Sequence, residues 1–552
     1  MTARYLESIP THELTIVRLL ERRAALAPEG PFYSWADSVS TFGEFNAAVN
    51  RMARRLVAAG ITRDTHVAVL MNTSPDYLTL WFALAKVGAV EIPINTAYMG
   101  DMLRHQLTTS TATVCVADAT FAPRVAEVAP SVPGLAHIFV RADQTADGAG
   151  GGVPGSRNFA ELLADDDEAN LGIEVRHDST AGIIFTSGTT GPSKGVLLSH
   201  HYLAAYGAMY ADINGLCSDD VVLNFLPFFH IGAKFQTIAT LVCGGRMRLL
   251  PRLSISTFLD EVTTHGVTNF VAVGGVCNML LSKPARPEDA HSTIRTVYAV
   301  PDPADVHEEM ERRFGCTMTT VYGSTEVGLP IFRGVGDEYR PGSCGRANPY
   351  YEIRVVDEFD NELPPGVAGE LVIRPKRPFL VGSGYIGMPD RTVEAWRNLW
   401  LHSGDRGRID DDGWFYFEDR ATDSLRRRGE NISSFEVETL VTGHPAVSEA
   451  IAVAAPAEVG EDDVWVLVTL REEHTTTPEE ILRHCADTMP YFMVPRYIDI
   501  VEDFPRTPTA KVEKYKLRAA GPGPTTWDRE AHGWKVTRTG LVHDADLLRS
   551  ST

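Results

Sequence analysis

The sequence predicts an α/β protein with a large N-terminal domain and a smaller C-terminal one. Its 552 residues are more than one hydrophobic core usually supports, so at least two domains are expected. Helix and strand patterns alternate along the chain, which indicates helices packed on largely parallel sheets. Hydrophobic residues make up 44% and charged residues 22%, as in ordinary globular proteins, so disorder of the whole chain is not expected.

The first predicted helix follows a capping box at residues 41–44. The Thr41 oxygen accepts a backbone N–H while Glu44 reaches back, and apolar residues then recur at helical spacing up to Leu56, before Gly60. The next predicted elements are a strand over 66–71, a helix over 76–87, and strands over 90–94 and 112–117. This order is typical of α/β layers.

The α/β pattern continues from 181 to 418, and a strongly basic, non-periodic stretch at 420–429 then indicates a domain boundary. A smaller unit follows, with predicted helices over 435–442 and 478–489 and predicted strands over 450–455, 464–470 and 497–501. The predicted organisation is a large domain over 1–419, a linking segment over 420–423, a small α+β domain over 424–520 and a loosely attached tail over 521–552.

The net charge of −21 argues against nucleic acid and anionic membranes as partners, because such a field repels them at long range. A site for a polyanionic ligand must therefore depend on local Lys, Arg or backbone N–H groups, or on a metal. The longest apolar stretch, 78–94, is interrupted by Lys86 and Glu91, so no membrane span is predicted.

The cysteines favour a cytoplasmic protein. There are seven, an odd number, and none forms a CxxC pair, so reduced thiols are expected rather than a disulfide framework or a zinc site. The N-terminal residues also lack the basic and apolar pattern of a signal peptide.

A loop rich in glycine and hydroxyl groups, TSGTTGPSKG at 186–195, follows an apolar strand. Small residues let backbone N–H groups approach phosphate oxygens, and Lys194 adds charge, so the loop is predicted to bind phosphate. It is not a Walker A loop, because Gly195 follows the lysine where Ser or Thr is needed. A serine-hydrolase elbow at 191–195 and a plain hairpin loop remain alternatives. A GxGxxG at 150–155 lies in a polar loop and is a weak dinucleotide signal.

The 186–195 loop resembles the signature loop of the adenylate-forming superfamily, which includes acyl-CoA synthetases, although Ser193 stands where that family usually has Pro. The resemblance implies layered α/β sheets with a small β subdomain, followed by a small mobile C-terminal domain. It also implies a set of nucleotide-binding residues in the loop: Thr186, Ser187, Gly188, Thr189, Thr190 and Lys194.

The segment YGSTE at 322–326 resembles the YGxTE motif of the same family. The resemblance implies that the Tyr322 ring lies against adenine, which needs an apolar face. It implies that the Thr325 hydroxyl meets the α-phosphate and that Glu326 holds Mg²⁺, the hard cation that a departing pyrophosphate requires. The remaining two residues of the motif, implied at the nucleotide, are Gly323 and Ser324.

Two further motifs, WLHSGD and DRATD, resemble family segments around the ribose and the hinge. Asp405 is implied to accept hydrogen bonds from ribose hydroxyls, as carboxylates do at other nucleotide sites. Arg420 is implied at the ribose and Phe417 at the nucleotide. Thr422 falls on the hinge position, often Asp or Lys in the family, so segment 420–423 is the predicted hinge.

The acyl and thiol sides of the site are implied by PFFHIG at 227–232. Phe229 is implied in the acyl pocket, and His230 is implied as a catalytic residue that borders the acyl and thiol channels. Read alone, His230 is an ordinary core or surface histidine. Gly274 and Gly275 are also implied in the acyl pocket, where they either leave room for a bulky acid or form a simple turn.

The small domain carries two motifs of its own. Gly429, in GENIS, is implied in the CoA tunnel together with His230. Lys511, in PRTPTAK, is implied as the catalytic lysine that bridges the substrate carboxylate and the α-phosphate. Ala510 replaces the usual glycine of that motif. The arginines at 426–428 either meet CoA phosphates or are solvated.

The family's Gly-Gly-Ala-Pro is missing before the YGxTE motif, where residues 298–302 read YAVPD. That replacement, with FYFEDR at 415–420 and RRGENIS at 427–433, resembles the crotonobetaine/carnitine-CoA ligase-like branch.

The resemblance implies an ATP-dependent carboxylic acid:CoA ligase that works through an acyl-adenylate, with ATP, Mg²⁺ and CoA as cofactor and co-substrates. A small-molecule carboxylic acid is the expected partner, its identity is not specified by the sequence, and a homodimer is left open. One alternative is an adenylating enzyme with a carrier-protein thiol or an amine as acceptor. Another is a nucleotide-binding homologue without turnover, which Thr422 and Ala510 motivate.

Overall fold

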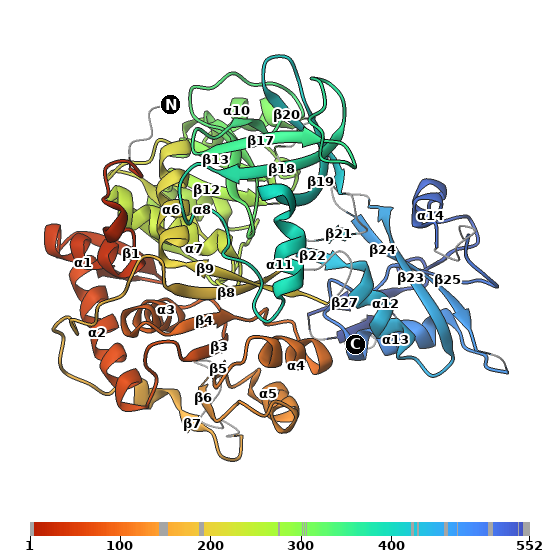
Figure 1. Ribbon diagram of the computed structural model, residues 1–552, viewed down its shortest axis with the longest axis horizontal. Helices are drawn as coiled ribbons and strands as arrows, with labels where there is room; N and C mark the ends of the chain where they lie inside the picture. The colour runs from red at the N-terminus through yellow and green to blue at the C-terminus, as the bar shows by residue number, and fades with distance from the viewer. Residues whose placement is uncertain are drawn as a thin grey trace. The chain divides into compact units, whose positions relative to one another are not determined.

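The computed structural model describes residues 5–142, 153–186, 192–273, 276–300, 302, 304, 306–420, 424–427, 430–457, 462–471, 473–505, 512–538 and 540–544. The chain divides into two compact units. The first consists of residues 1–96, 103–185 and 195–419, and the second of residues 97–102, 186–194 and 420–552. Figure 1 follows the chain from red at the N-terminus to blue at the C-terminus.

The first unit contains a seven-stranded sheet with the strand order β7-β6-β5-β3-β4-β8-β9. The pairs from β7 to β8 are all parallel, as the alternation of helix and strand patterns predicts. The strands are β3 (His66–Leu70), β4 (Val90–Pro93), β5 (Val114–Asp118), β6 (His137–Arg141), β7 (Arg157–Asn158), β8 (Thr180–Thr186) and β9 (Lys194–Ser199).

Two of the helices that accompany this sheet, α2 and α3, were predicted from the sequence with their capping signals. In α2 the Thr41 side chain accepts the Glu44 N–H and Glu44 returns to the Thr41 N–H, so the capping box is confirmed. Helix α3 ends at Gly88, whose φ of 74° suits a residue without Cβ. The helices are α1 (Ile16–Leu26), α2 (Phe42–Ala58), α3 (Pro75–Val87), α4 (Gly100–Thr109) and α5 (Ala122–Val128).

The first unit also contains a thirteen-stranded sheet. Its order is β17-β18-β19-β20-β16-β15-β14-β13-β12-β10-β11-β1-β2. The strands from β14 through β10 to β1 pair in parallel, and those from β14 to β20 pair antiparallel. The antiparallel part, with β17 to β19, corresponds to the expected β subdomain.

The strands of this sheet are β1 (Pro31–Trp35), β2 (Ser38–Thr41), β10 (Val221–Asn224), β11 (Arg246–Leu249), β12 (Asn269–Val273), β13 (Thr296–Val300), β14 (Thr317–Ser324), β15 (Gly328–Arg333), β16 (Gly345–Ala347), β17 (Tyr351–Val356), β18 (Gly369–Pro375), β19 (Leu401–Ile409) and β20 (Trp414–Arg420). Its helices are α6 (His200–Ile213), α7 (Ile231–Cys243), α8 (Phe258–His265), α9 (Val276–Leu281), α10 (His307–Phe314) and α11 (Pro389–Ala395).

One hydrophobic core joins the two sheets of the first unit. Helices α6 and α7 lie within it and are buried along nearly their whole length. Large side chains such as Trp81, Tyr210 and Phe235 are buried there. The burial of each apolar side chain of this kind stabilises the fold by about 1.5–3 kcal/mol. The core therefore holds the strand ends that carry the site in fixed positions.

The second unit is a smaller α+β structure, whose main part, residues 420–552, is drawn in shades of blue in Figure 1. Its central sheet has the order β23-β24-β25-β26, and two separate hairpins accompany it. The elements are β21 (Ser424–Arg427), β22 (Glu430–Ser433), α12 (Ser434–Thr442), β23 (Val447–Pro456), β24 (Asp462–Leu470), α13 (Pro478–Thr488), β25 (Tyr497–Ile500), α14 (Lys514–Ala520), β26 (Trp527–Asp528), β27 (Trp534–Thr537) and β28 (Gly540–His543).

The expectation of a loosely attached C-terminal tail is wrong for its described residues, 521–538 and 540–544. Trp527 pairs with Ile498, so the segment adds a strand to the sheet of the second unit. Arg529 is 1% exposed and Trp534 is 8% exposed. The polar, Pro- and Gly-rich start of the segment conceals these anchoring residues in the sequence.

The structure adds two observations on compartment and membrane. All seven cysteines lie in the described part of the chain and are free thiols. Among the described residues, no helix has both the length and the apolar character that crossing a bilayer would require.

Candidate active site

The centre of the candidate site is a hydrogen bond between two predicted nucleotide-binding residues. The Tyr322 hydroxyl on β14 donates to Asp405 Oδ2 on β19 at 2.7 Å, and both residues are buried. The Phe417 ring on β20 lies 6.4 Å from the Tyr322 ring, with the two ring planes 29° apart, and Phe417 is 42% exposed. The structure thus brings together three predicted residues: a carboxylate and two aromatic faces.

The backbone around Tyr322 depends on a close approach between β14 and β15. A Cβ on Gly323 would lie 2.3 Å from the Gly328 carbonyl oxygen, so a larger residue cannot fit there. The Ser324 hydroxyl donates to Glu326 Oε2 at 3.0 Å and accepts the Glu326 N–H at 3.2 Å. The Tyr202 hydroxyl holds the Thr325 carbonyl at 2.8 Å. These bonds fix the turn that presents Thr325 and Glu326.

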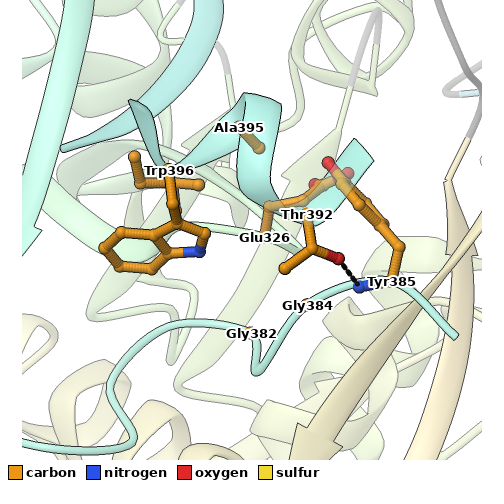
Figure 2. Close-up of a pocket in the computed structure, with 8 residues that line it drawn as sticks. Glu326, Gly382, Gly384, Tyr385, Thr392, Ala395 and Trp396 are labelled. Carbon is orange, nitrogen blue, oxygen red and sulfur yellow. Dashed lines mark hydrogen bonds between the residues drawn. The ribbon is translucent and has the colours of Figure 1, made fainter. Parts of the chain in front are cut away.

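A small, partly open recess lies beside the Glu326 carboxylate. Figure 2 shows Tyr385 and Thr392 next to Glu326, with the Tyr385 N–H donating to the Thr392 hydroxyl at 3.0 Å. The Tyr385 hydroxyl forms a hydrogen bond with Glu326, and burial together with that carboxylate raises the pKa of Tyr385 well above its ordinary value. The recess is lined by Glu326, Gly382, Gly384, Tyr385, Thr392, Ala395, Trp396 and Leu401.

The chain segment that carries Tyr385 is held against β9, the strand that follows the phosphate loop. Leu197 N–H donates to the Gly384 carbonyl at 2.9 Å, and Ser383 N–H returns to the Leu197 carbonyl at 2.8 Å. Gly382 permits this approach, since a Cβ there would lie 2.5 Å from Val196. Sequence reasoning missed Tyr385; the glycines that flank it were the available signal.

The Glu326 carboxylate fits a magnesium ion in one respect. Mg²⁺ usually binds to one or two carboxylates plus substrate phosphates and water, rather than to an all-protein cage. Glu326 is a partly exposed single carboxylate at the edge of the recess. Within the described ranges, no group of three His, Cys, Asp or Glu side chains is placed to hold a metal by itself.

The predicted acyl and thiol side begins at the N-terminus of α7. His230 is the N-cap residue of α7, and its side chain does not cap the helix. The Phe229 and His230 rings lie 4.7 Å apart, and both residues are half-buried. The preceding residue, Phe228, is instead completely buried.

The phosphate loop is described only at its ends. Thr186 is the last residue of β8 and Lys194 the first of β9, and these strands are neighbours in the sheet. Arg420 ends β20. Several predicted site residues lie outside the described residues: Ser187, Gly188, Thr189, Thr190, Gly274, Gly275, Thr422, Gly429 and Lys511.

Arg427 fits neither sequence interpretation, a contact with CoA phosphates or a solvated charge. It is 5% exposed, and its guanidinium pairs with Asp463 at 2.8 Å and donates to the Val494 carbonyl at 2.9 Å. Asp463 is paired in turn with Arg496 at 3.0 Å. Arg427 is therefore a structural arginine of the second unit.

Comparison with known proteins identifies the family. The model of the AMP-binding enzyme family matches residues 20–386, and the model of the AMP-binding enzyme C-terminal domain matches residues 436–511. The chain belongs to the AMP-binding enzyme family. The predicted resemblance to the adenylate-forming superfamily is therefore confirmed.

Individual relatives agree with this assignment. A crotonobetaine/carnitine–CoA ligase of Salmonella arizonae is 31% identical over 88% of this chain and 95% of its own length. The ATP-bound structure of MatB from Rhodopseudomonas palustris is 26% identical, with a TM-score of 0.67 over 92% of this chain and 99% of MatB. For the fold alone, o-succinylbenzoate CoA synthetase from Bacillus subtilis has a TM-score of 0.79 at 24% identity, over 91% of this chain and 98% of its own.

These relatives confirm two predictions about this AMP-binding enzyme. The similarity to the crotonobetaine/carnitine-CoA ligase-like branch is confirmed at about 30% identity over most of the chain. Its class is that of an AMP-forming acid–thiol ligase.

Proposed function

We propose that this AMP-binding enzyme activates a small carboxylic acid with ATP and then transfers the acyl group to CoA. In the first step the carboxylate attacks the α-phosphorus of ATP, forming acyl-AMP and releasing pyrophosphate. In the second step the CoA thiol, having lost its proton, attacks the acyl carbonyl and expels AMP. A carboxylate needs this activation because its own leaving group would be oxide, whereas AMP is a good leaving group.

The observation that carries the proposal is the hydrogen bond between Tyr322 and Asp405. It places a buried carboxylate beside an aromatic ring, the two groups that a ribose and an adenine require. When the nucleotide binds, Asp405 accepts hydrogen bonds from the ribose hydroxyls and the Tyr322 ring lies against the base. Phe417 lies near enough to cover the same nucleotide.

The phosphates of ATP are assigned to the turn that presents Thr325 and Glu326. Thr325 donates a hydrogen bond to the α-phosphate, and Thr186 and Lys194 contact the phosphates from the ends of the glycine-rich loop. Magnesium bound at Glu326 would neutralise the charge of the departing pyrophosphate. The Ser324 and Tyr385 hydroxyls orient the Glu326 carboxylate for that task.

The small domain supplies different residues in the two steps. Lys511 bridges the substrate carboxylate and the α-phosphate during adenylate formation. After a rotation about the hinge at 420–423, Gly429 enters the tunnel for the pantetheine arm of CoA, next to His230. Phe229 borders the acyl group. This alternation couples a domain movement to the order of the chemistry.

We place the enzyme in the cytoplasm, where ATP and CoA are available and thiols are kept reduced. The seven free cysteines support that location.

The decisive experiment measures pyrophosphate release over a panel of acids, with product analysis in the presence and absence of CoA. The panel contains acyl, aryl, betaine-like and polycyclic acids. The betaine-like acids are included because crotonobetaine and carnitine are the acids named for the relatives. We expect pyrophosphate and AMP with at least one acid, and an acyl-CoA product only when CoA is present. Acid-dependent pyrophosphate release without acyl-CoA would indicate another acceptor, and no release with any acid would overturn the proposal.

A further inference from the structure

A completely buried ion pair lies behind the acyl and thiol side of the site. Lys234 Nζ on α7 is 2.9 Å and 2.6 Å from the two carboxylate oxygens of Glu91 on β4. The side chains of Lys234 and Glu91 are 1% and 2% exposed. The Tyr77 hydroxyl on α3 donates to the same carboxylate at 3.0 Å. The pair thus connects β4 and α3 with α7.

Aromatic rings complete the surroundings of the lysine. Lys234 Nζ lies 4.1 Å from the centre of the Trp81 ring, within the range of a cation–π contact. The Phe228 ring stacks on Tyr77 at 5.2 Å and lies 6.0 Å from Trp81. Phe228 therefore packs against the aromatic residues that surround the ion pair. Because Phe228 directly precedes Phe229 and His230, this packing also restricts the backbone of those two residues.

The first turn of α7 is fixed from a second direction. The Asn224 side chain, at the end of β10, donates to the Ala233 carbonyl at 2.9 Å. The Gln236 side chain on α7 donates to Asn224 Oδ1 at 3.3 Å. Polar contacts to both sheets therefore determine where the helix begins and how it is rotated about its axis.

A buried ion pair is a costly way to fill this space. Removing both charges from water costs several kcal/mol, and apolar side chains of similar volume are often neutral or stabilising in such a position. Unlike apolar packing, an ion pair requires a particular geometry, and this requirement fixes the position of α7 along its own axis. Glu91 also pairs in register with Gly182 on β8, the strand that leads into the phosphate loop.

We propose that the Lys234–Glu91 ion pair is a positioning device that holds Phe229 and His230 at the acyl and thiol side of the site. The inference rests on the proposed function, because that function places Phe229 beside the acyl group and His230 beside the CoA thiol. Loss of the pair lets α7 and the turn before it shift, and a displacement of about 1 Å at a reacting group can cost about a hundredfold in rate.

The test uses two variants and a matched control. Lys234→Met removes the cation and leaves Glu91 buried alone, while Lys234→Met with Glu91→Leu removes both charges. Lys86→Met is the control, because Lys86 lies at the far end of α3, is 2% exposed and pairs with Glu21 at 3.3 Å. For each protein we measure the unfolding temperature, acid-dependent pyrophosphate exchange, and thioester formation from supplied acyl-adenylate.

We expect Lys234→Met to lower thioester formation at least about tenfold and to raise the KM of the acid, while the KM of ATP changes less than about twofold. The double variant regains thermal stability but not the thioester rate. Lys86→Met lowers only the unfolding temperature. The proposal is overturned if the double variant forms thioester at the unsubstituted rate, and this variant also decides the matter if Lys234→Met does not fold.

Two further results separate this inference from the proposed function. If the unsubstituted enzyme makes no acyl-CoA, the function fails before any variant is compared. If His230→Ala lowers thioester formation while the double variant does not, His230 keeps its role and only the positioning device is rejected.

Discussion

At the scale of single residues, the site uses carboxylates whose orientation is set by hydroxyl neighbours. Asp405 accepts from Tyr322, and Glu326 accepts from Ser324 and Tyr385. Because each carboxylate is already oriented in the protein alone, little order has to be created when the nucleotide binds. In the proposed function the two carboxylates contact different parts of the nucleotide, so their substitution should have separable effects.

We predict that Asp405→Ala raises the KM of ATP by about tenfold to a hundredfold. Hydrogen bonds to a charged group contribute about 1.5–3 kcal/mol, and each 1.4 kcal/mol is a factor of ten. Steady-state kinetics at saturating acid and CoA measures the change. Asp411→Asn, which removes the same charge from an exposed turn, is the control and should leave the KM unchanged. An equal rise in the KM of the acid would argue against a ribose contact.

We predict that Glu326→Gln raises the Mg²⁺ concentration needed for half-maximal pyrophosphate exchange, since a neutral amide is a weaker ligand for this cation. A magnesium titration at fixed ATP measures the shift. Glu358→Gln changes an exposed acid on a surface turn and serves as the control. An unchanged Mg²⁺ requirement with a lower maximal rate would show that Glu326 acts on the substrate without binding the metal.

At the scale of elements, local signals in the sequence predicted local structure well. Helices α2 and α3 start and end at their capping residues, and β3 and β4 follow runs of apolar residues. Such signals are read within a few neighbouring residues.

Features that depend on distant partners could not be predicted. Arg427 looks like a surface arginine because Asp463, its partner, lies far along the chain. Lys234 interrupts an apolar helix, and nothing near it in sequence indicates Glu91. Tyr385 likewise belongs to no recognised sequence motif, and its hydrogen bond with Glu326 forms only in the folded protein. The family motifs supplied most of the site assignments that periodicity could not provide.

The capping box of α2 allows a prediction at the same scale. We expect Thr41→Ala to weaken the first turn by about 1 kcal/mol, because the Glu44 N–H loses its acceptor. Hydrogen exchange of the amides in that turn should become about fivefold faster. Thr41→Ser keeps the hydroxyl and should exchange at the unsubstituted rate. Equal exchange in both variants would mean that packing alone holds the helix start.

At the scale of the whole molecule, each of the two units has its own hydrophobic core. In the second unit the C-terminal segment adds the edge strand β26 to the sheet. Arg496 links Asp463 to Asp528 of that segment at 3.0 and 3.3 Å. The family model for the C-terminal domain matches residues 436–511, so this segment lies beyond the matched residues.

We predict that deletion of residues 525–552 destabilises the second unit by about 3 kcal/mol or more, since truncating a single buried tryptophan costs about that much. The deletion also exposes the edge of β25, which promotes aggregation. Thermal unfolding and light scattering measure both effects. Deletion of 545–552 removes none of the described residues and is the control. Identical unfolding curves for the two deletions would contradict the structural role of β26 to β28.

The alternation between two steps leads to the last prediction. If the small domain presents Lys511 only during adenylate formation, Lys511→Ala should lower acid-dependent pyrophosphate exchange at least about a hundredfold. Thioester formation from supplied acyl-adenylate should then stay within about threefold, because the proposed second step depends on His230 and the Gly429 loop instead. Lys516→Ala removes a nearby exposed lysine, whose partner is Glu513, and should leave both half-reactions unchanged. A comparable loss in both half-reactions of the Lys511 variant would mean that one fixed arrangement of the domains serves the whole reaction.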